Sequence, residues 1–353
     1  MVAQARALRP RIAALRQEEA AARQQLQEAE RLTIEEVQLL HAAFTHQPDP
    51  PEAHQALVEH YRARHEEAER TGQLSAAALE QQLRRHDRTD AHTAYLSGEV
   101  FISLDTEPPN AVVTLHRGEE VDRRIVYRLE RTVRAPVVDL RLPHVRWLIE
   151  VSASNHHTAR IPLWLERAGR WESRSRVRLP GSVGEADCLI SAGAFTCGGD
   201  PDAYSALPQR RVWLPDFVMK KRPVTNREFI AFLDDLVTMG AEEDSLRWVL
   251  RERAGQRGEP GALLYGCRPD GGFTLQEDAD GHLWLPGWPV LCVDWHGTQA
   301  YADWLAKRTA LPWRLPSELE WEKAAGRGDG RQFPWGDHLD PTWCGVRRSR
   351  RPG

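Results

Sequence analysis

The sequence has 353 residues, of which 41% are hydrophobic and 28% are charged, a composition typical of globular rather than disordered or fibrous proteins. Its formal net charge of −4 combines 47 Lys and Arg with 51 Asp and Glu residues. Such a balance gives no global electrostatic reason to expect nucleic acid or an anionic membrane as a partner. The length suffices for two or three domains with separate cores, so we expect several modules.

Five widely spaced cysteines contain no CxxC pair, so neither a disulfide framework nor a zinc site is indicated. The first 25 residues are charged throughout and lack the apolar core of a signal peptide. No stretch approaches the roughly 18 apolar residues that a membrane helix requires. We therefore predict a cytoplasmic protein without a membrane partner.

Residues 1–90 are predicted to be helical, because Ala, Leu, Glu, Gln and Arg dominate them. Prolines near residues 48–51 end the first helix, and further helices are expected over 52–70 and 75–88. Two interpretations of the first helix are open: a coiled-coil arm for self-association, or an amphipathic helix packed on its own chain. The apolar heptad positions are Leu8, Ile12, Leu15, Ala22, Leu26 and Ala29.

Three histidines of the second predicted helix, His54, His60 and His65, are interpreted as surface residues. Eleven residues of helix separate His54 from His65 by roughly 16 Å. His60 points elsewhere, so one metal ion cannot join the three.

Residues 91–180 change from helical to alternating periodicity. The spacing predicts a β-hairpin from Val100 to Leu115, turning at Glu107-Pro108-Pro109-Asn110. Seven short strands with turn signals between them indicate a small β-sandwich. This succession of strands and prolines loosely resembles the small β-domain called PEGA. The other five expected strands are Ile125–Leu129, Val137–Leu142, Trp147–Val151, Ile161–Leu165 and Arg176–Leu179.

Residues 181–353 carry the most informative motifs. Residues 192–199 form an apolar strand running into a glycine turn, and Thr225 with Glu228 has the spacing of a capping box at a helix start. The same device recurs at Ser317 and Glu320. Two well-defined helix starts are therefore predicted in this region.

Between the two boxes, residues 289–294 are predicted to form a buried strand in which Cys292 is a structural cysteine. Asp294 caps the helix that follows, and Arg314 is expected to pair with Glu318. An aromatic turn, Phe333-Pro334-Trp335-Gly336-Asp337, closes the region.

Two weaker patterns receive structural interpretations. Residues 278–281 have the Asp-x-Asp-Gly sequence of a calcium loop but lack its further oxygen ligands, so a hairpin turn is predicted. Four arginines after Cys344 are interpreted as a solvated tail, without a nucleic-acid partner. They are Arg347, Arg348, Arg350 and Arg351.

From about Cys188 to Gly353 the chain resembles the sulfatase-modifying-factor, or formylglycine-generating-enzyme, family. The resemblance rests on the glycine-rich strand at 193–199, PVTNREF at 223–229, residues 289–304, RLPSELEWEKAA at 314–325 and PWGD at 334–337. It implies an irregular α+β, C-type-lectin-like fold. We expect the family-signature residues to be structural: Thr225, Asn226, Glu228, Trp295, Trp304, Arg314, Glu318, Glu320, Trp321, Trp335 and Gly336.

The same resemblance implies copper, possibly with calcium, and oxygen-dependent conversion of cysteine to formylglycine. The family's copper-binding cysteines lie in a C-terminal half to which no residue of this sequence corresponds, so no cofactor or catalytic residue is assigned and no metal site is predicted. The domain order also resembles the region downstream of some bacterial serine/threonine kinases, although the sequence has no kinase signature.

The sequence thus predicts three parts, 1–90, 91–180 and 181–353, and a non-catalytic or incomplete family member that binds or regulates within a bacterial signalling-type protein. A protein partner, or the missing half, would complete it. The alternatives are a formylglycine-generating oxidase completed elsewhere and a lectin-like display of a variable ligand surface.

Overall fold

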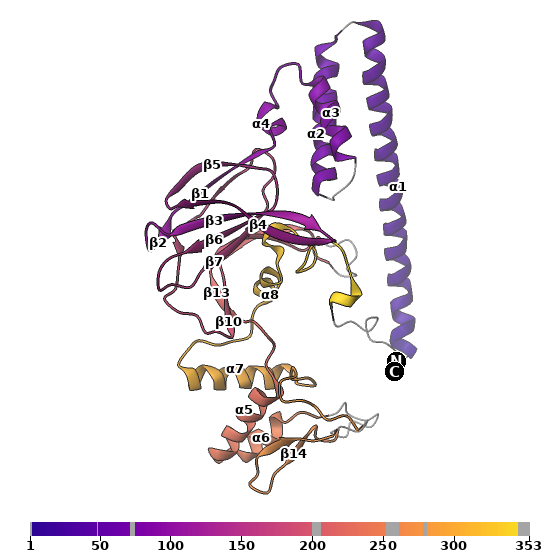
Figure 1. Cartoon of the computed structure of the whole chain (residues 1–353). Helices are drawn as coiled ribbons and strands as arrows, with labels where there is room; N and C mark the ends of the chain where they lie inside the picture. Colours follow the sequence, from indigo (N-terminus) through magenta and orange to yellow (C-terminus); the bar gives the residue numbers. More distant parts are fainter. Residues whose placement is uncertain are drawn as a thin grey trace. The chain divides into compact units, whose positions relative to one another are not determined.

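The computed structural model describes residues 2–47, 49–70, 75–199, 206–251, 261–277 and 281–344. The chain divides into two compact units. The first contains residues 1–100 and 167–169, and the second contains residues 101–166 and 170–353. Figure 1 shows the elements in chain order. Within the described ranges, no helix combines the length and apolar character needed to cross a membrane.

The first unit is helical, as predicted. Val58, Leu83, Tyr95 and Leu96 form its buried apolar cluster. The two helices expected after the proline tract begin and end within two residues of the predicted limits. The bounds are α1 Val2–His46, α2 Pro51–Arg70, α3 Ala76–His86 and α4 Thr93–Leu96.

The long helix α1 presents apolar side chains to solvent in its second half, where Leu32, Ile34 and Leu39 are 51%, 60% and 67% exposed. Toward its C-terminal end, His41 Nε2 lies 3.1 Å from the Tyr61 hydroxyl of α2. The side chains of Leu8, Ile12, Leu15 and Leu26 lie outside the described residues. The coiled-coil arm and the packed helix both remain predictions for α1.

Two of the three histidines of α2 are buried, so the surface interpretation is wrong for them. His54 is 6% and His65 is 1% exposed. The reason is that α2 buries positions 53, 54, 57, 58, 65 and 68, one face of a helix with 3.6 residues per turn. His54 Nδ1 lies 3.0 Å from His86 Nδ1, and His65 Nδ1 lies 2.6 Å from the Tyr95 hydroxyl.

Two sheets occupy the first part of the second unit. Burial alternates along β1, β3 and β6, as expected of strands that cover a core with one face. The strands with the order β5-β1-β8 form one sheet, those with the order β4-β3-β6-β7 form the other, and β2 pairs with β9. Their bounds are β1 Glu99–Leu104, β2 Thr106–Glu107, β3 Val112–Val121, β4 Arg124–Arg134, β5 Val137–Pro143, β6 Trp147–Ser152, β7 Ala159–Leu163, β8 Arg170–Glu172 and β9 Val177–Arg178.

The predicted hairpin from Val100 to Leu115 is wrong, although both of its strands exist. β1 belongs to the sheet with β5 and β8, whereas β3 pairs with β4 and β6. The turn at residues 107–110 therefore carries the chain from one sheet to the other. Both strands have the same alternating pattern, and periodicity alone does not distinguish partners within one sheet from strands of two sheets.

The remainder of the second unit combines short antiparallel ladders with helices. β10 pairs with β13, β11 with β12, and β14 with β15. The predicted apolar strand and glycine turn are confirmed, since β11 ends before Gly198 and Gly199, which have φ angles of 71° and 75°. The bounds are β10 Asp187–Ile190, β11 Gly193–Cys197, β12 Arg210–Leu214, β13 Phe217–Lys220, α5 Asn226–Thr238, α6 Glu242–Trp248, β14 Tyr265–Cys267, β15 Phe273–Leu275, α7 Trp295–Thr309, α8 Glu318–Ala324, η1 Arg327–Asp329 and η2 Pro341–Trp343.

An aromatic cluster forms the core around α5 and α7. Phe229 and Phe232 of α5 meet Tyr301 of α7, with ring centres 5.8 Å apart in both pairs. The charged segment 240–285 contributes Tyr265 and Phe273 to the same cluster, at 0% and 1% exposure. This segment is therefore part of the core rather than a surface addition.

Residues 289–294 do not form the predicted buried strand. Thr225 and Pro289 make only an isolated bridge, and the Val290 amide donates to the Val224 carbonyl at 2.9 Å. Cys292 is exposed with a φ of 58°, and Leu291 is 58% exposed. Only Val290 and Val293 pack against the aromatic cluster. The apolar run is thus a loop anchored by two valines three residues apart, and the structural role predicted for Cys292 is wrong.

The calcium-like residues 278–280 lie outside the described residues, as do the arginines after Cys344. On either side of the former, Glu277 and Leu283 form an antiparallel bridge. The Cys344 thiol donates to the Asp340 carbonyl at 3.8 Å.

The buried histidines predict a pH-dependent first unit. Burial, together with the neighbouring His54 and His41, lowers the pKa of His86 from 6.5 to about 4. The unfolded chain therefore takes up this proton at a higher pH than the native state does, and stability is lost as the pH falls from about 6.5 toward about 4. We expect amide protection in α2 and α3 to fall by roughly tenfold between pH 7 and pH 5.

Hydrogen exchange, corrected for its intrinsic pH dependence, measures this change. His86→Phe should flatten the pH profile, because phenylalanine fills the aromatic site without titrating. His46→Phe, at an exposed position of α1, should retain the wild-type profile. A His86→Phe profile as steep as that of the wild type would contradict the assignment.

Candidate functional site

The first signature motif fixes the start of α5. The Thr225 hydroxyl accepts the Glu228 amide, and a Glu228 carboxylate oxygen accepts the Thr225 amide at 2.8 Å, so the predicted capping box is confirmed. Asn226, at 0% exposure, donates to the Leu285 carbonyl at 3.0 Å and accepts the Tyr265 hydroxyl proton at 2.7 Å. One buried amide thus ties α5 to β14 and to the loop at Leu285.

The second signature helix, α7, begins at the predicted cap. Asp294 Oδ1 accepts the Gly297 amide at 2.7 Å. Trp304 packs against the aromatic cluster, and its indole nitrogen donates to Asp235 at 2.7 Å. Trp295, at 65% exposure, lies outside that cluster. Of these two signature tryptophans, only Trp304 therefore has a packing role.

The third signature motif fixes the start of α8. The capping box of Ser317 and Glu320 is confirmed. Arg314 donates two hydrogen bonds to the Glu320 carboxylate, at 2.8 and 2.6 Å. These bonds, with those from Ser317, lower the pKa of Glu320 to about 2.

The predicted pairing of Arg314 with Glu318 is wrong. The Glu320 side chain reaches back toward the helix start in order to cap it, which carries its carboxylate to Arg314, whereas Glu318 is exposed. The capping geometry thus selects the partner of Arg314.

The aromatic turn at 333–337 lies against the β4 edge. The Ile125 amide donates to the Trp335 carbonyl at 2.7 Å, and Arg146 donates to Asp337 at 2.7 Å. A side chain at Gly336, where φ is 153°, would approach the Arg123 carbonyl to 3.2 Å. Close contact with the strand therefore explains the glycine.

A buried ion pair reinforces this contact. Asp329 is 0% exposed and accepts bonds from Arg331 at 2.6 Å and from the Tyr127 hydroxyl of β4 at 2.5 Å. Burial and the Asp329 carboxylate raise the pKa of Tyr127 well above its usual value. Tyr127 consequently stays protonated as the donor at neutral pH.

Lys323 is a buried cation that the sequence reasoning missed. Its ammonium donates to the carbonyls of Ser191 at 2.7 Å and Gly193 at 3.1 Å, and reaches that of Leu214 at 3.5 Å. Burial lowers its pKa to about 8. A lysine in an amphipathic helix ordinarily lies at the surface, so only its place on the inward face of α8, next to buried Glu320, offered a signal.

A groove of about 880 Å³ opens beside α8, and we call it the apolar groove. Of the signature residues it contains Arg314, Glu320 and Trp321, and not the remaining eight. Trp321, Leu311 and Val218 are 64%, 53% and 42% exposed. Its principal apolar lining is Phe229, Tyr301, Leu305, Leu311, Trp313 and Trp321.

The thiols give little support for metal or redox chemistry. None of the five cysteines, all of which lie in the described ranges, forms a disulfide. The Cys188 thiol donates to the Met219 carbonyl at 3.3 Å, and burial raises its pKa, which disfavours the thiolate. Within the described ranges no three His, Cys, Asp or Glu side chains are grouped to hold a metal ion. No residues of the described ranges are therefore assigned to copper or calcium.

Capped helices, two-stranded ladders and an aromatic core define this part of the chain as an irregular α+β domain. The family model of the sulfatase-modifying factor enzyme 1-like domain matches residues 176–349. Those residues belong to that domain family.

Relatives of three kinds are similar to part of this chain. The chain is 32% identical over 188 residues to the formylglycine-generating enzyme of Thermomonospora curvata, covering 46% of this chain and 56% of that protein. It is 32% identical over 155 residues to the serine/threonine-protein kinase Pkn1 of Chlamydia trachomatis, covering 44% and 22%. With the inactive C-alpha-formylglycine-generating enzyme 2 of Bos taurus it shares 30% over 203 residues, covering 54% and 61%. The matches thus span between about a fifth and three fifths of these relatives.

The helix start at α8 gives a stability prediction with a matched control. Glu320→Ala removes the capping box and the partner of Arg314, and we expect it to lower the free energy of unfolding by about 1–2 kcal/mol. Glu318→Ala, two residues away and exposed, should change it by less than about 0.5 kcal/mol.

Urea unfolding followed by tryptophan fluorescence measures both variants. Because the pKa of Glu320 is lowered from 4.5 to about 2, the difference from wild type should shrink as the pH falls through that interval. Equal losses for the two variants would contradict the pairing of Arg314 with Glu320.

Proposed function

We propose that the domain formed by residues 176–349 is a protein-binding module of a signalling-type protein, and that the apolar groove holds its partner. The observation that carries the proposal is the gathering of exposed apolar side chains around one concave surface, with Trp321 at 64% exposure. Large exposed apolar patches mark interaction sites, and tryptophans are frequent anchors of binding energy.

The charge of the rim indicates the chemistry of the partner. Lys220, Lys221 and Arg222 follow one another along the groove. Lys220 lies 5.2 Å from the centre of the Trp313 ring and 3.9 Å from the carboxylates of Asp187 and Glu228. Lys221 and Arg222 are exposed, so they supply the positive charge of the rim. A segment with an apolar or aromatic residue next to acidic residues would complement both the lining and the rim.

The relatives support a module that functions without the oxidase chemistry. One match lies within a much longer protein named as a serine/threonine kinase, and another protein carries the word inactive in its name. Burial raises the pKa of the Cys188 thiol, which disfavours the reactive thiolate and so agrees with a role that does not use cysteine chemistry. The two sheets that precede the domain would then form the PEGA-like sandwich of a cytoplasmic bacterial signalling protein, with α1 available for self-association.

The similarity to the formylglycine-generating enzyme favours a second candidate, an oxidase completed by further residues or another chain. The family resemblance implies copper and oxygen for that activity. Incubating the protein with copper, oxygen and a cysteine-containing peptide, followed by mass spectrometry for formylglycine, tests it directly. Formation of formylglycine would replace the binding-module proposal with the oxidase.

Peptide binding tests the groove. A random peptide library panned on the protein should enrich sequences with an apolar or aromatic residue beside acidic ones. For a synthetic peptide of that kind, Trp321→Ala should weaken binding by at least about tenfold, because it removes an aromatic anchor. Calorimetric titration measures the dissociation constants.

Trp295→Ala is the matched control, because Trp295 is 65% exposed and lies outside the apolar groove. It should bind like the wild type. Enriched peptides without an acidic and apolar bias, or equal binding to the two variants, would contradict the proposal.

A further inference from the structure

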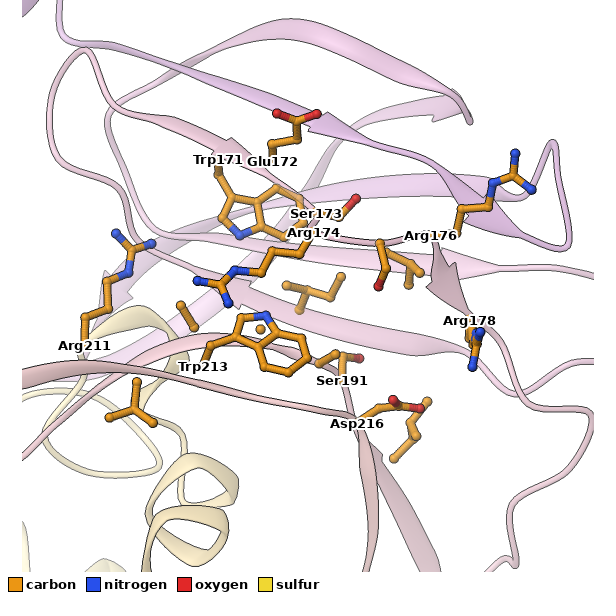
Figure 2. A pocket seen from close by; sticks show the side chains of 18 of the residues that line it. Trp171, Glu172, Ser173, Arg174, Arg176, Arg178, Ser191, Arg211, Trp213 and Asp216 are labelled. Atoms are coloured by element: carbon orange, nitrogen blue, oxygen red, sulfur yellow. The ribbon is translucent and has the colours of Figure 1, made fainter.

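A second cavity, of about 530 Å³, lies between the segment 170–178 and the β11–β12 ladder. Its volume falls in the range of roughly 300–1,000 Å³ typical of small-molecule sites. Figure 2 shows Trp171, Arg174, Arg211 and Trp213 around it, with Ser191 beside Trp213. We call it the arginine–tryptophan cavity.

The arginines around this cavity fall into two groups. Arg170, Arg176 and Arg178 have carboxylate partners, respectively Asp139, Asp105 and Glu107. Arg174 and Arg211 have no ion-pair partner among the residues that the structure describes, and both are exposed. Two guanidinium groups are therefore available for an anion.

The Arg174 side chain is directed to the Trp213 ring, and Arg211 lies on the same strand as that tryptophan. The Arg174 guanidinium carbon lies 5.4 Å from the centre of the Trp213 ring. Arg211 precedes Trp213 by two residues on β12, so their side chains share one face of the strand. Trp213 is 36% exposed and Trp171 is partly exposed, which leaves indole surface for a flat ring.

The base of the cavity holds an unsatisfied polar group. Ser191 is 9% exposed, and its hydroxyl oxygen has no hydrogen-bond partner. Buried hydroxyls are ordinarily hydrogen-bonded, so this one needs a partner that the described protein residues do not supply, and a polar ligand atom or a water can be that partner. The Lys323 ammonium, which holds the Ser191 carbonyl at 2.7 Å, adds positive potential from behind the wall.

The carboxylates near the cavity do not neutralise its positive end. Figure 2 shows the Glu172 carboxylate directed away from Arg174, and Asp216 at the opposite end from Arg211. Asp216 interacts electrostatically with Lys323. The end defined by Arg174, Arg211 and Trp213 therefore combines positive charge with an aromatic face.

We propose that the arginine–tryptophan cavity binds an aromatic ring that carries a phosphate, with the ring on Trp213 and Trp171, the phosphate on Arg174 and Arg211, and a polar ring or sugar atom on Ser191. Guanidinium groups bind phosphate oxygens through charge-assisted hydrogen bonds, and indole faces stack with flat rings. Nucleoside monophosphates and aryl phosphates share this chemistry. The site is separate from the apolar groove and does not depend on the proposed protein-binding function.

Calorimetric titration with adenosine monophosphate and with phenyl phosphate tests the site. The ligand that binds more tightly shows whether the site prefers a nucleoside monophosphate or an aryl phosphate. Adenosine and inorganic phosphate each supply only one half of the ligand, and each should bind at least about tenfold more weakly. Arg174→Gln and Arg211→Gln should each weaken binding of the better ligand by about tenfold or more.

Arg178→Gln is the matched control, since it removes a charge from the same cavity where the arginine is paired with Glu107. It should bind like the wild type, and unchanged melting curves show that all three variants fold. The proposal is overturned if neither phosphate ester binds, if inorganic phosphate or adenosine binds as tightly as the esters, or if the three arginine variants lose affinity equally.

Discussion

One ammonium group, that of Lys323, holds together the carbonyls at one end of the β11–β12 ladder. The second unit has short strands and many loops, so much of its backbone lies outside ladders or helices, and buried carbonyls there need other donors. Asn226 does the same for the Leu285 carbonyl, and Asp329 accepts bonds from two separate elements. In regular sheets, long ladders supply the hydrogen-bond partners of buried backbone groups. In this unit, side chains supply many of those partners instead.

This arrangement also positions the two surfaces for which we propose binding. Lys323 lies on α8, whose Glu320 and Trp321 line the apolar groove, while its ammonium reaches Ser191 in the arginine–tryptophan cavity. The same helix therefore contributes an exposed aromatic anchor to one surface and electrostatic potential to the other. Neither surface uses Trp304, Asn226 or the aromatic turn, which belong to the packing of the domain.

Features that depend on residues close together in the sequence, such as helix caps, were predicted correctly. Both capping boxes and the Asp294 cap follow from side chains three residues apart, and all were found. Features that depend on contacts between distant parts of the chain could not be predicted from local sequence patterns. The partner strands of β1 and β3, the burial of His54 and His65, and the exposure of Cys292 depend on what packs against each segment. The two cavities could not be predicted from the sequence for the same reason, because their walls come from segments far apart in the chain.

The contact between the aromatic turn and β4 has a consequence for how such proteins are assembled by recombination. A genetic exchange at the start of the matched region, residue 176, would separate Asp329 from Tyr127, Asp337 from Arg146 and the Trp335 carbonyl from the Ile125 amide. The transferred piece would carry a fully buried carboxylate with one of its donors lost. A transferred piece that keeps these contacts must therefore include the preceding sheet, so the structural unit extends upstream of the matched family region.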